Sequence, residues 1–338
     1  MKRRATVIIG VLSVTAVLLT PIAAMATFPS SNGKLAFQRG GDIWIASQQV
    51  TSPTEPSLIE RRLTFNGISR NPRWSSDGRR LAYNTTTGVI KTMSAWGTNR
   101  RNVVVGHAYQ PAWSPELPSG ERIVFVKRPV GKEGDLWTVP ARGGIPRRLT
   151  SDGAANCGVM WPSWSPDGTT IAYHRTMRGP DHVCRSGDDR TQVIVLTLAT
   201  MQRRVVPIPT LDEFGDPILW TQLVTAPDFS AGGDRVLFAM MLGGDGCLQF
   251  LGWYDLASGR SSTEEWGYQC EGGPTLIDVG PAPAGGEWSI LQDWSDSRHV
   301  TITYDCPGVP AAGGCWTESF AGRNAWVAPD VQPQPVRR

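Results

Sequence analysis

The sequence predicts an all-β protein, a six-bladed β-propeller of four-stranded antiparallel blades. Three observations lead to this fold class. The 338 residues include Gly 37, Pro 26 and Trp 14, while charged residues make up only 19%. Short apolar runs of the kind that form β-strands alternate with turns that contain glycine and proline. These runs fall into six segments that repeat at the length of a propeller blade.

The N-terminus precedes the repeats and has the layout of a leader. Basic residues at positions 2–4 are followed by an apolar run at 7–19 and by the small-residue sequence Ala-Met-Ala at 24–26. This order is typical of a secretory signal peptide, so we assign 1–26 to a signal peptide and expect a secreted, periplasmic or cell-envelope protein. An uncleaved anchor is the alternative, because the run is just long enough to span a bilayer. After cleavage, no transmembrane segment is expected.

The charge of the chain argues against nucleic acid as a partner. The formal net charge is +3, and removal of the three basic residues of the leader brings it to about zero. The remaining basic residues are scattered in pairs, with no basic stripe that carries interleaved aromatic residues. A nucleic-acid-binding surface normally requires such a stripe.

A glycine followed by a three-residue apolar run marks each repeat. These glycines recur at intervals of 42 to 65 residues, and the last copy is the weakest. They are Gly33, Gly78, Gly120, Gly168, Gly233 and Gly286. The segment WSPDGTTIAY at 164–173 shows the turn chemistry that surrounds them, in which proline fixes φ, aspartate caps the turn and glycine takes a positive φ. Its serine recurs in four blades, so we interpret Ser165 as scaffold and not as a nucleophile.

A Pro-x-Trp run precedes most of these glycines. Proline cannot donate to a strand ladder and is confined to sheet edges. We therefore expect this run to be the innermost strand of each blade, with one edge toward the central channel. The copies are Pro72-Arg-Trp74, Pro111-Ala-Trp113, Pro162-Ser-Trp164, Pro227-Asp-Phe229 and a decayed copy at Pro281.

Two further runs complete the blade. An Asp-x-Trp run occurs at 42–44 and 135–137, and an Arg-Arg-Leu-Thr run at 61–64 and 147–150. Each unit thus contains four short β-like runs. One four-stranded sheet cannot bury both of its faces, whereas sheets packed side by side around an axis bury the faces of their neighbours. The recurring Trp and Phe side chains supply the large apolar bodies that fill the space between sheets.

The combined phrase PxWSPDGxxIAY…DLWxV…RRLT resembles the blade repeat of TolB-type β-propellers. The resemblance extends from Gly33 to Ala328 and is strongest in the second to fourth units. It implies six blades. TolB also has an α/β domain before its propeller, and the residues between Ala26 and Gly33 are too few for one. We therefore expect a propeller alone, at 27–329, and do not carry over the partners of TolB.

The two ends of the chain are expected to meet in the first blade and to close the ring. The first blade lacks an innermost strand of its own, because only residues 27–32 precede Gly33. Propellers of this kind are often closed by a strand from the other terminus, and the residues beyond Trp326 are the candidates. The last stretch, 330–338, is expected to be a polar C-terminal tail.

Six cysteines in an exported chain indicate disulfide bonds, and six cysteines allow fifteen pairings. We label the strands of a blade A to D from the channel outward. The D–A and B–C connections then lie on one face, here called the loop face, and carry the first four cysteines. The expected pairs are Cys157–Cys184, Cys247–Cys270 and Cys306–Cys315. No Cys-x-x-Cys motif occurs and histidines are few, so neither a metal site nor a cofactor is predicted.

Two groups of residues are candidates for binding. Asp181 and His182 lie in a long connection rich in Asp and Arg, which is either a ligand or metal loop or a solvated insertion tied down by Cys184. The second group consists of innermost-strand residues near the channel, Asn71, Gln110, Trp161 and Asp228.

The sequence contains no nucleophile elbow, P-loop or dinucleotide fingerprint. No catalytic residue is assigned, and the sequence favours a monomeric binding module that presents a loop face to a protein, peptide or glycan in the cell envelope. Two alternatives stay open. One is an enzyme, a lyase or hydrolase that acts in the central channel, and the other is a structural part of a cell-surface assembly. The fold alone does not choose among them.

Overall fold

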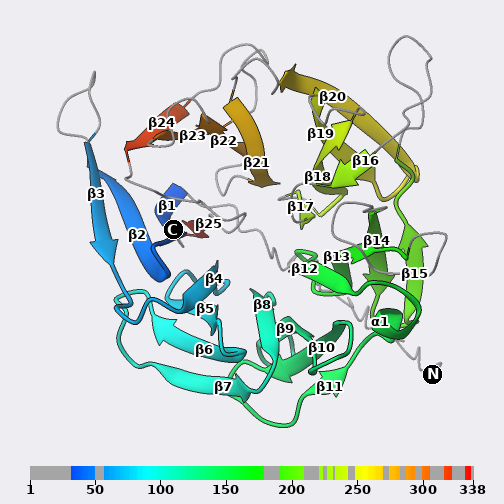
Figure 1. Ribbon diagram of the computed structural model, residues 1–338, viewed down its shortest axis with the longest axis horizontal. Helices are drawn as coiled ribbons and strands as arrows, with labels where there is room; N and C mark the ends of the chain where they lie inside the picture. The colour runs from blue at the N-terminus through cyan, green and yellow to red at the C-terminus, as the bar shows by residue number, and fades with distance from the viewer. Residues whose placement is uncertain are drawn as a thin grey trace, which may run out of the picture.

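The protein is a β-propeller, and its described residues form six antiparallel sheets that stand around a common centre in chain order (Figure 1). The computed structural model describes residues 32–49, 57–178, 191–208, 221–223, 227–230, 233–242, 248–268, 274–281, 287–293, 299–304, 316–321 and 332–335. The all-β architecture expected from the repeats is confirmed. One four-residue helix, α1 (Asp152–Ala155), lies between the third and fourth blades and was not anticipated by the blade repeat.

The first three blades each have four strands. Blade one consists of β1 (Asn32–Arg39), β2 (Asp42–Gln49), β3 (Ser57–Arg62) and β25 (Gln332–Pro335). Blade two consists of β4 (Ser69–Trp74), β5 (Arg80–Thr85), β6 (Val89–Ser94) and β7 (Arg101–Val105). Blade three consists of β8 (Ala108–Trp113), β9 (Arg122–Lys127), β10 (Asp135–Pro140) and β11 (Arg147–Arg148).

Blades four and six also have four strands, and blade five has five. Blade four consists of β12 (Val159–Trp164), β13 (Thr170–Thr176), β14 (Thr191–Thr197) and β15 (Gln202–Val205). Blade five consists of β16 (Thr221–Leu223), β17 (Asp228–Phe229), β18 (Arg235–Leu242), β19 (Leu248–Asp255) and β20 (Arg260–Tyr268). Blade six consists of β21 (Pro274–Pro281), β22 (Glu287–Asp293), β23 (His299–Tyr304) and β24 (Trp316–Ala321).

The innermost strands of blades two to four are the ones that carry the repeated proline. Pro72, Pro111 and Pro162 lie in β4, β8 and β12, and each of these strands is the first of its sheet. Because a strand at the edge has one side without a ladder, it tolerates a residue that has no N–H. The inner strands contact one another in succession from β25 through β4, β8, β12 and β17 to β21.

The C-terminus supplies the innermost strand of blade one. Strand β25 pairs antiparallel with β1, with Pro333 opposite Leu35 and Gln332 opposite Ala36 (Figure 1). The sequence had assigned 330–338 to a polar tail, and the structure instead places 332–335 in a sheet. The physical reason is that β1 needs an inner neighbour, and the proline-containing segment suits an edge position. The strand comes from beyond Trp326, where the sequence places the closing segment.

The core lies between blades and not within them. Successive residues of a strand point to opposite faces of the sheet. On β5, Leu81 and Tyr83 therefore pack against blade one, in a buried cluster with Ile43, while Ala82 packs against blade three, in a cluster with Trp113. The position of Tyr83 recurs as Phe125, Tyr173 and Phe238, all 1% exposed or less. Full burial of such an aromatic side chain contributes about 2 kcal/mol to folding.

The turns between strands A and B of blades three, four and five pack against one another. These turns and the C–D connections form the face opposite the loop face, here called the turn face. Gly168 has a φ of +69°, and a Cβ atom there would lie 2.3 Å from the side chain of Leu117 in the preceding blade. Gly233 has a φ of +73°, and its Cβ would lie 3.0 Å from Pro166. Glycine is thus required both for the turn and for the neighbouring turn to pack against it.

Candidate binding site

The serine of the repeated turn is part of the scaffold. In blade four, Ser165 Oγ donates to Asp167 Oδ1 at 2.6 Å and accepts the N–H of Thr170 at 2.9 Å. In blade two, Ser75 Oγ donates in the same way to Asp77 Oδ1 at 2.6 Å. Burial would raise the pKa of Asp167, but hydrogen bonds from Ser165 and the turn backbone outweigh it and hold the pKa below its usual value. These serines bridge a turn to a strand, as the recurrence predicted.

A second repeated contact joins the start of strand C to the end of strand D. In blade three, Asp135 accepts from the Thr150 hydroxyl at 3.1 Å, from the Gly153 N–H at 3.0 Å and from the Arg148 guanidinium at 2.5 Å. The Thr150 hydroxyl in turn accepts the N–H of Leu136 at 3.0 Å. The corresponding residues of blade one are Asp42, Arg62, Thr64 and Gly67. The Asp-x-Trp and Arg-Leu-Thr runs therefore form a structural contact, here called the clasp, between the start of strand C and the end of strand D.

Three of the predicted channel residues lie at the same position of three successive inner strands, where each strand has a bulge. They are Asn71, Gln110 and Trp161. The pairing with strand B shifts at each of them, and their φ values are +56°, +51° and +54°. Such a backbone costs about 1 kcal/mol or more for a residue other than glycine. Hydrogen bonds between blades offset this cost. The Gln110 N–H donates to Asn84 Oδ1 at 3.0 Å, and the Trp161 N–H donates to Gln110 Oε1 at 3.1 Å. Gln110 thus holds blades two, three and four together.

The fourth predicted channel residue, Asp228, does not lie at this bulge. It follows the proline of its inner strand, the position that Arg73 and Ser163 occupy in blades two and four. The Ser163 hydroxyl donates to the Asp228 carboxylate, and the Phe229 N–H donates to its Oδ1 at 2.9 Å. Burial raises the pKa of Asp228, and the charge of Arg73 and these hydrogen bonds oppose the increase. The structure thus brings together Arg73, Ser163 and Asp228 from three blades.

His174 occupies the strand position in blade four that Asn84 occupies in blade two. It is 6% exposed, and its Nε2 atom has no hydrogen-bond partner. Burial lowers the pKa of His174 to about 4, so the imidazole is neutral at physiological pH. The sequence shows only that histidines are few, and the position of His174 on the buried face of β13 becomes visible in the structure.

Several predicted residues lie outside the described part of the chain. Asp181 and His182 are among them, so the interpretation of their connection stays a prediction. Of the six cysteines, Cys157 is described. It lies between α1 and β12 on the loop face, and its N–H donates to the Thr176 carbonyl at 2.8 Å. The three expected cysteine pairs stay predictions.

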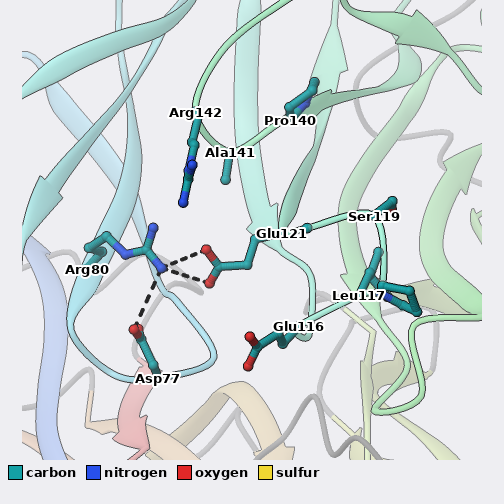
Figure 2. A pocket seen from close by; sticks show the side chains of 11 residues that line it. Asp77, Arg80, Glu116, Leu117, Ser119, Glu121, Pro140, Ala141 and Arg142 are labelled. Carbon is teal, nitrogen blue, oxygen red and sulfur yellow. Dashed lines mark hydrogen bonds and ion pairs between the residues drawn. The ribbon is translucent and has the colours of Figure 1, made fainter.

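An open pocket of about 710 Å³ lies on the turn face between blades two and three (Figure 2). Its walls are the A–B turn of blade two, the longer A–B connection of blade three and the C–D connection of blade three. The charged lining residues are Asp77, Arg80, Glu116, Glu121 and Arg142, and the apolar ones include Leu117, Pro118, Pro140 and Ala141. The pocket therefore combines both signs of charge with apolar walls.

Arg80 is fixed in this pocket, whereas Arg142 is not. The Arg80 Nη2 atom donates to both carboxylate oxygens of Glu121, at 2.7 and 2.8 Å, and lies 3.7 Å from Asp77 Oδ2. The guanidinium also lies 4.9 Å over the Trp113 ring. Arg142 is exposed, and its side chain makes no hydrogen bond or ion pair within the described residues. Figure 2 shows it directed toward Arg80 and Glu121.

The sequence interpretation missed this pocket, although one feature of the repeat indicates it. Serine and glycine of the A–B turn are three positions apart in blade two (Ser75 and Gly78) and in blade four. In blade three, Ser114 and Gly120 are six positions apart. The three additional residues build the wall that contains Glu116, Leu117 and Pro118, so an insertion in one copy of the repeat marks the site.

The pocket is suited to non-covalent recognition, because it offers charged donors and acceptors over apolar walls. Within the described ranges, no group of three or more His, Cys, Asp or Glu side chains is placed to hold a metal ion. None of the helices in the described part of the chain has the length and apolar character of a membrane span.

Comparisons with known proteins define the class of fold. No family profile and no curated protein sequence matches the chain. Among solved structures, TolB from Acinetobacter baumannii has a TM-score of 0.58 and 14% identity, with 90% of this chain and 67% of that chain covered. The periplasmic gluconolactonase PpgL of Pseudomonas aeruginosa has a TM-score of 0.53 and 14% identity, with 91% and 100% covered. A chain of a nidogen/laminin complex has a TM-score of 0.55 and 12% identity, with 85% and 93% covered.

These similarities establish a β-propeller. Within that class, the chain has a TolB-type β-propeller fold, as the blade repeat predicted. At these identities the similarity concerns the fold, and neighbours with one fold differ in what they do.

Proposed function

We propose that this chain is an exported binding module that recognises a protein, peptide or glycan partner in the cell envelope. The observation that carries the proposal is the pocket between blades two and three, with Arg142 directed into it (Figure 2). The repeated Ser, Asp, Thr and Arg side chains of the blades are engaged in scaffold contacts, whereas Arg142 is available for a ligand. The nidogen/laminin neighbour, a protein complex by its name, is consistent with a propeller that binds another protein.

Export is supported by the leader at 1–26 and by the similarity to a gluconolactonase described as periplasmic. The six cysteines, which we expect to form disulfide bonds, agree with an oxidising compartment. We expect N-terminal sequencing of the protein purified from its native host to begin at Thr27. A chain that begins upstream of the apolar run and stays with the membrane fraction would favour the uncleaved anchor.

The binding function is tested by capture of partners from an envelope extract with two matched variants. Ser119→Trp places a large side chain at the exposed rim of the pocket, and we expect the partners captured by the wild type to be lost. Thr86→Trp places the same side chain at an exposed position of the B–C turn of blade two, on the loop face, and should leave capture unchanged. If Thr86→Trp alone abolishes capture, the recognition surface lies on the loop face. If neither variant changes the captured proteins, the pocket is not the binding site.

A second candidate is an enzyme that acts at the ring centre, favoured by Asp228 with its raised pKa beside Ser163 and by the gluconolactonase neighbour. A carboxyl group with a raised pKa is a common component of acid–base chemistry. Assays of gluconolactone hydrolysis with the wild type and Asp228→Asn, together with metal analysis of the purified protein, test it. Turnover that requires Asp228 would replace the binding proposal with a catalytic one.

A further inference from the structure

We propose that the pocket binds a carboxylate of its partner, an acidic side chain of a peptide segment, between the guanidinium groups of Arg142 and Arg80. The inference rests on the proposed binding function and names the chemistry that the pocket recognises. Both guanidinium groups face the same open volume, and Figure 2 shows the Arg142 side chain pointing toward Arg80. Two cationic groups directed at each other across an open space are stabilised when an anion lies between them.

The Arg80 side chain is pre-organised for such a ligand by its existing contacts. Its Nη2 atom is engaged with Glu121 and Asp77, and its plane is packed over Trp113 at 4.9 Å. Its Nη1 atom makes no hydrogen bond within the described residues. A guanidinium fixed in this way donates its remaining N–H groups without losing further side-chain freedom, and carboxylates are its best-matched acceptors.

The lining holds three carboxylates, those of Asp77, Glu116 and Glu121, against two guanidinium groups, so an anion is favoured only close to Arg142. The Glu121 carboxylate is already paired with Arg80 through both oxygens. Asp77 accepts from the Ser75 hydroxyl and the Arg79 N–H. A basic side chain of a partner would compete for these occupied carboxylates and would face Arg142. No carboxylate of the described residues pairs with Arg142, so an acidic side chain of a partner would form an ion pair with it.

The apolar walls and Glu116 refine the ligand further. Pro118, Leu117 and Pro140 provide apolar surface beside the guanidinium groups, which suits the methylene stem of a glutamate and the backbone that carries it. Glu116 lies in the same lining and repels an anion. The pocket therefore binds a single carboxylate weakly and contributes specificity within a larger contact, because exposed charge pairs are individually worth little.

The test uses three blocked hexapeptides that differ only at two central positions, which are Glu, Gln or Lys, titrated into the full-length mature protein and followed by NMR. We expect the Glu peptide to bind, the Gln peptide to bind about tenfold more weakly and the Lys peptide not to bind. High salt should weaken binding of the Glu peptide. Equal binding of the Glu and Gln peptides, or a preference for Lys, would overturn the inference.

Single substitutions connect the peptide result to the site. Arg142→Gln should weaken binding of the Glu peptide about tenfold, and Arg142→Lys should recover part of it, because lysine keeps the charge but not the planar donors. Glu116→Gln should strengthen binding by about two- to fivefold through loss of repulsion. Arg128→Gln, an exposed arginine of blade three on the loop face, is the control and should have no effect.

The outcomes separate this inference from the proposed function. If Ser119→Trp abolishes partner capture while Arg142→Gln leaves binding of the Glu peptide unchanged, the pocket is a binding site and its ligand is not a carboxylate at Arg142. If Ser119→Trp leaves capture unchanged, the binding function of the pocket fails, whichever peptide binds.

Discussion

At the scale of single residues, the fold depends on side chains that satisfy two partners at once. Ser165 is 4% exposed, and its hydroxyl serves the Thr170 N–H and the Asp167 carboxylate together. Removal of the Ser165 hydroxyl leaves the Thr170 N–H without this hydrogen bond and takes one donor from Asp167, which keeps its bonds from Thr169. A polar group left without a partner costs more than the bond itself contributes. Gln110 works in the same way, since its N–H and its side-chain oxygen face different blades.

We therefore predict that Ser165→Ala lowers the free energy of unfolding by about 1–2 kcal/mol, measured by chemical denaturation. Thr169→Ala removes only exposed hydrogen bonds of the same turn and should change stability by less than about 0.5 kcal/mol. If the two variants are equally mild, the serine is not the bridge between turn and strand.

His174 gives a prediction about pH. Its pKa is lowered by burial from 6.5 to about 4, so between these values the unfolded chain binds more protons than the folded chain. Stability therefore falls as the pH decreases from about 6.5 to about 4, by about 3 kcal/mol from this group. The pKa of Asp228 is raised in the folded chain, so the contribution of this group to stability instead increases as the pH decreases. The variant His174→Asn, which introduces the residue found at the equivalent position in blade two, should show a flatter stability profile over this range. An unchanged profile would contradict the assignment.

At the scale of strands, polar contacts place each element relative to the next. The clasp of Asp135, Arg148 and Thr150 fixes the start of β10 against the end of β11, and the equivalent clasp of blade one fixes β2 against β3. The bulge of β8 bonds to β5 of blade two through Gln110 and Asn84, and the bulge of β12 bonds to β8 through Trp161 and Gln110. The sheets are thus joined by hydrogen bonds at the centre and by apolar packing farther out.

Asp42 makes the clasp of blade one sensitive to acid. Burial would raise its pKa, but hydrogen bonds from Thr64, Arg62 and two backbone N–H groups outweigh it and hold the pKa below 3.8. Its stabilising contribution is complete above the unfolded pKa and is lost as the pH falls through the lower, folded value. Asp42→Asn should therefore destabilise the protein at neutral pH and reduce the slope of acid unfolding below about pH 4. A variant with the same acid slope as the wild type would show that the carboxylate is not held in this way.

The sequence predicted the elements whose chemistry repeats and missed those that arise from differences among the copies. Local chemistry explains the positions of the prolines at 72, 111 and 162 and of the glycines at the A–B turns. The inner strands and the turns could therefore be predicted from the sequence. The hydrogen bond that the Gln110 N–H donates to Asn84 joins residues at different positions of the repeat, and no local pattern reveals it. Asp228 was grouped with the bulge residues because the register shift is not visible in sequence. The pocket depends on connections from two blades, and only the insertion before Gly120 points to it.

At the scale of the whole molecule, blade one contains both ends of the described chain. Strand β25 gives β1 its inner partner and contacts β4 of the next blade. Deletion of residues 332–338 should therefore lower the free energy of unfolding by about 3 kcal/mol or more, since a sheet edge and the adjoining blade lose their partner at once. Deletion of 336–338 alone keeps β25 and is the control. Equal stability of the two truncated proteins in thermal unfolding would show that β25 does not close the blade.

The pocket is also a property of the assembled ring. Arg80 from blade two and Glu121 from blade three form the ion pair that joins its walls, and the C–D connection of blade three brings Arg142 over it. A change at this interface would alter the relative position of the two blades and, through it, the binding proposed for the pocket. The proposed recognition site is thus built from connections, and the strands hold these connections in place, as is usual for loops on a scaffold.

Hydrogen–deuterium exchange of the mature protein, with and without its captured partner, tests the central claim most directly. This claim is that repeated side chains build the ring and that, as proposed, recognition occurs at the turn-face pocket between blades two and three. We expect the partner to slow exchange in the peptides that cover 75–80, 114–121 and 140–145, with little change in the inner strands. Protection confined to the loop face or to the inner strands around Asp228, with none in these three segments, would contradict it.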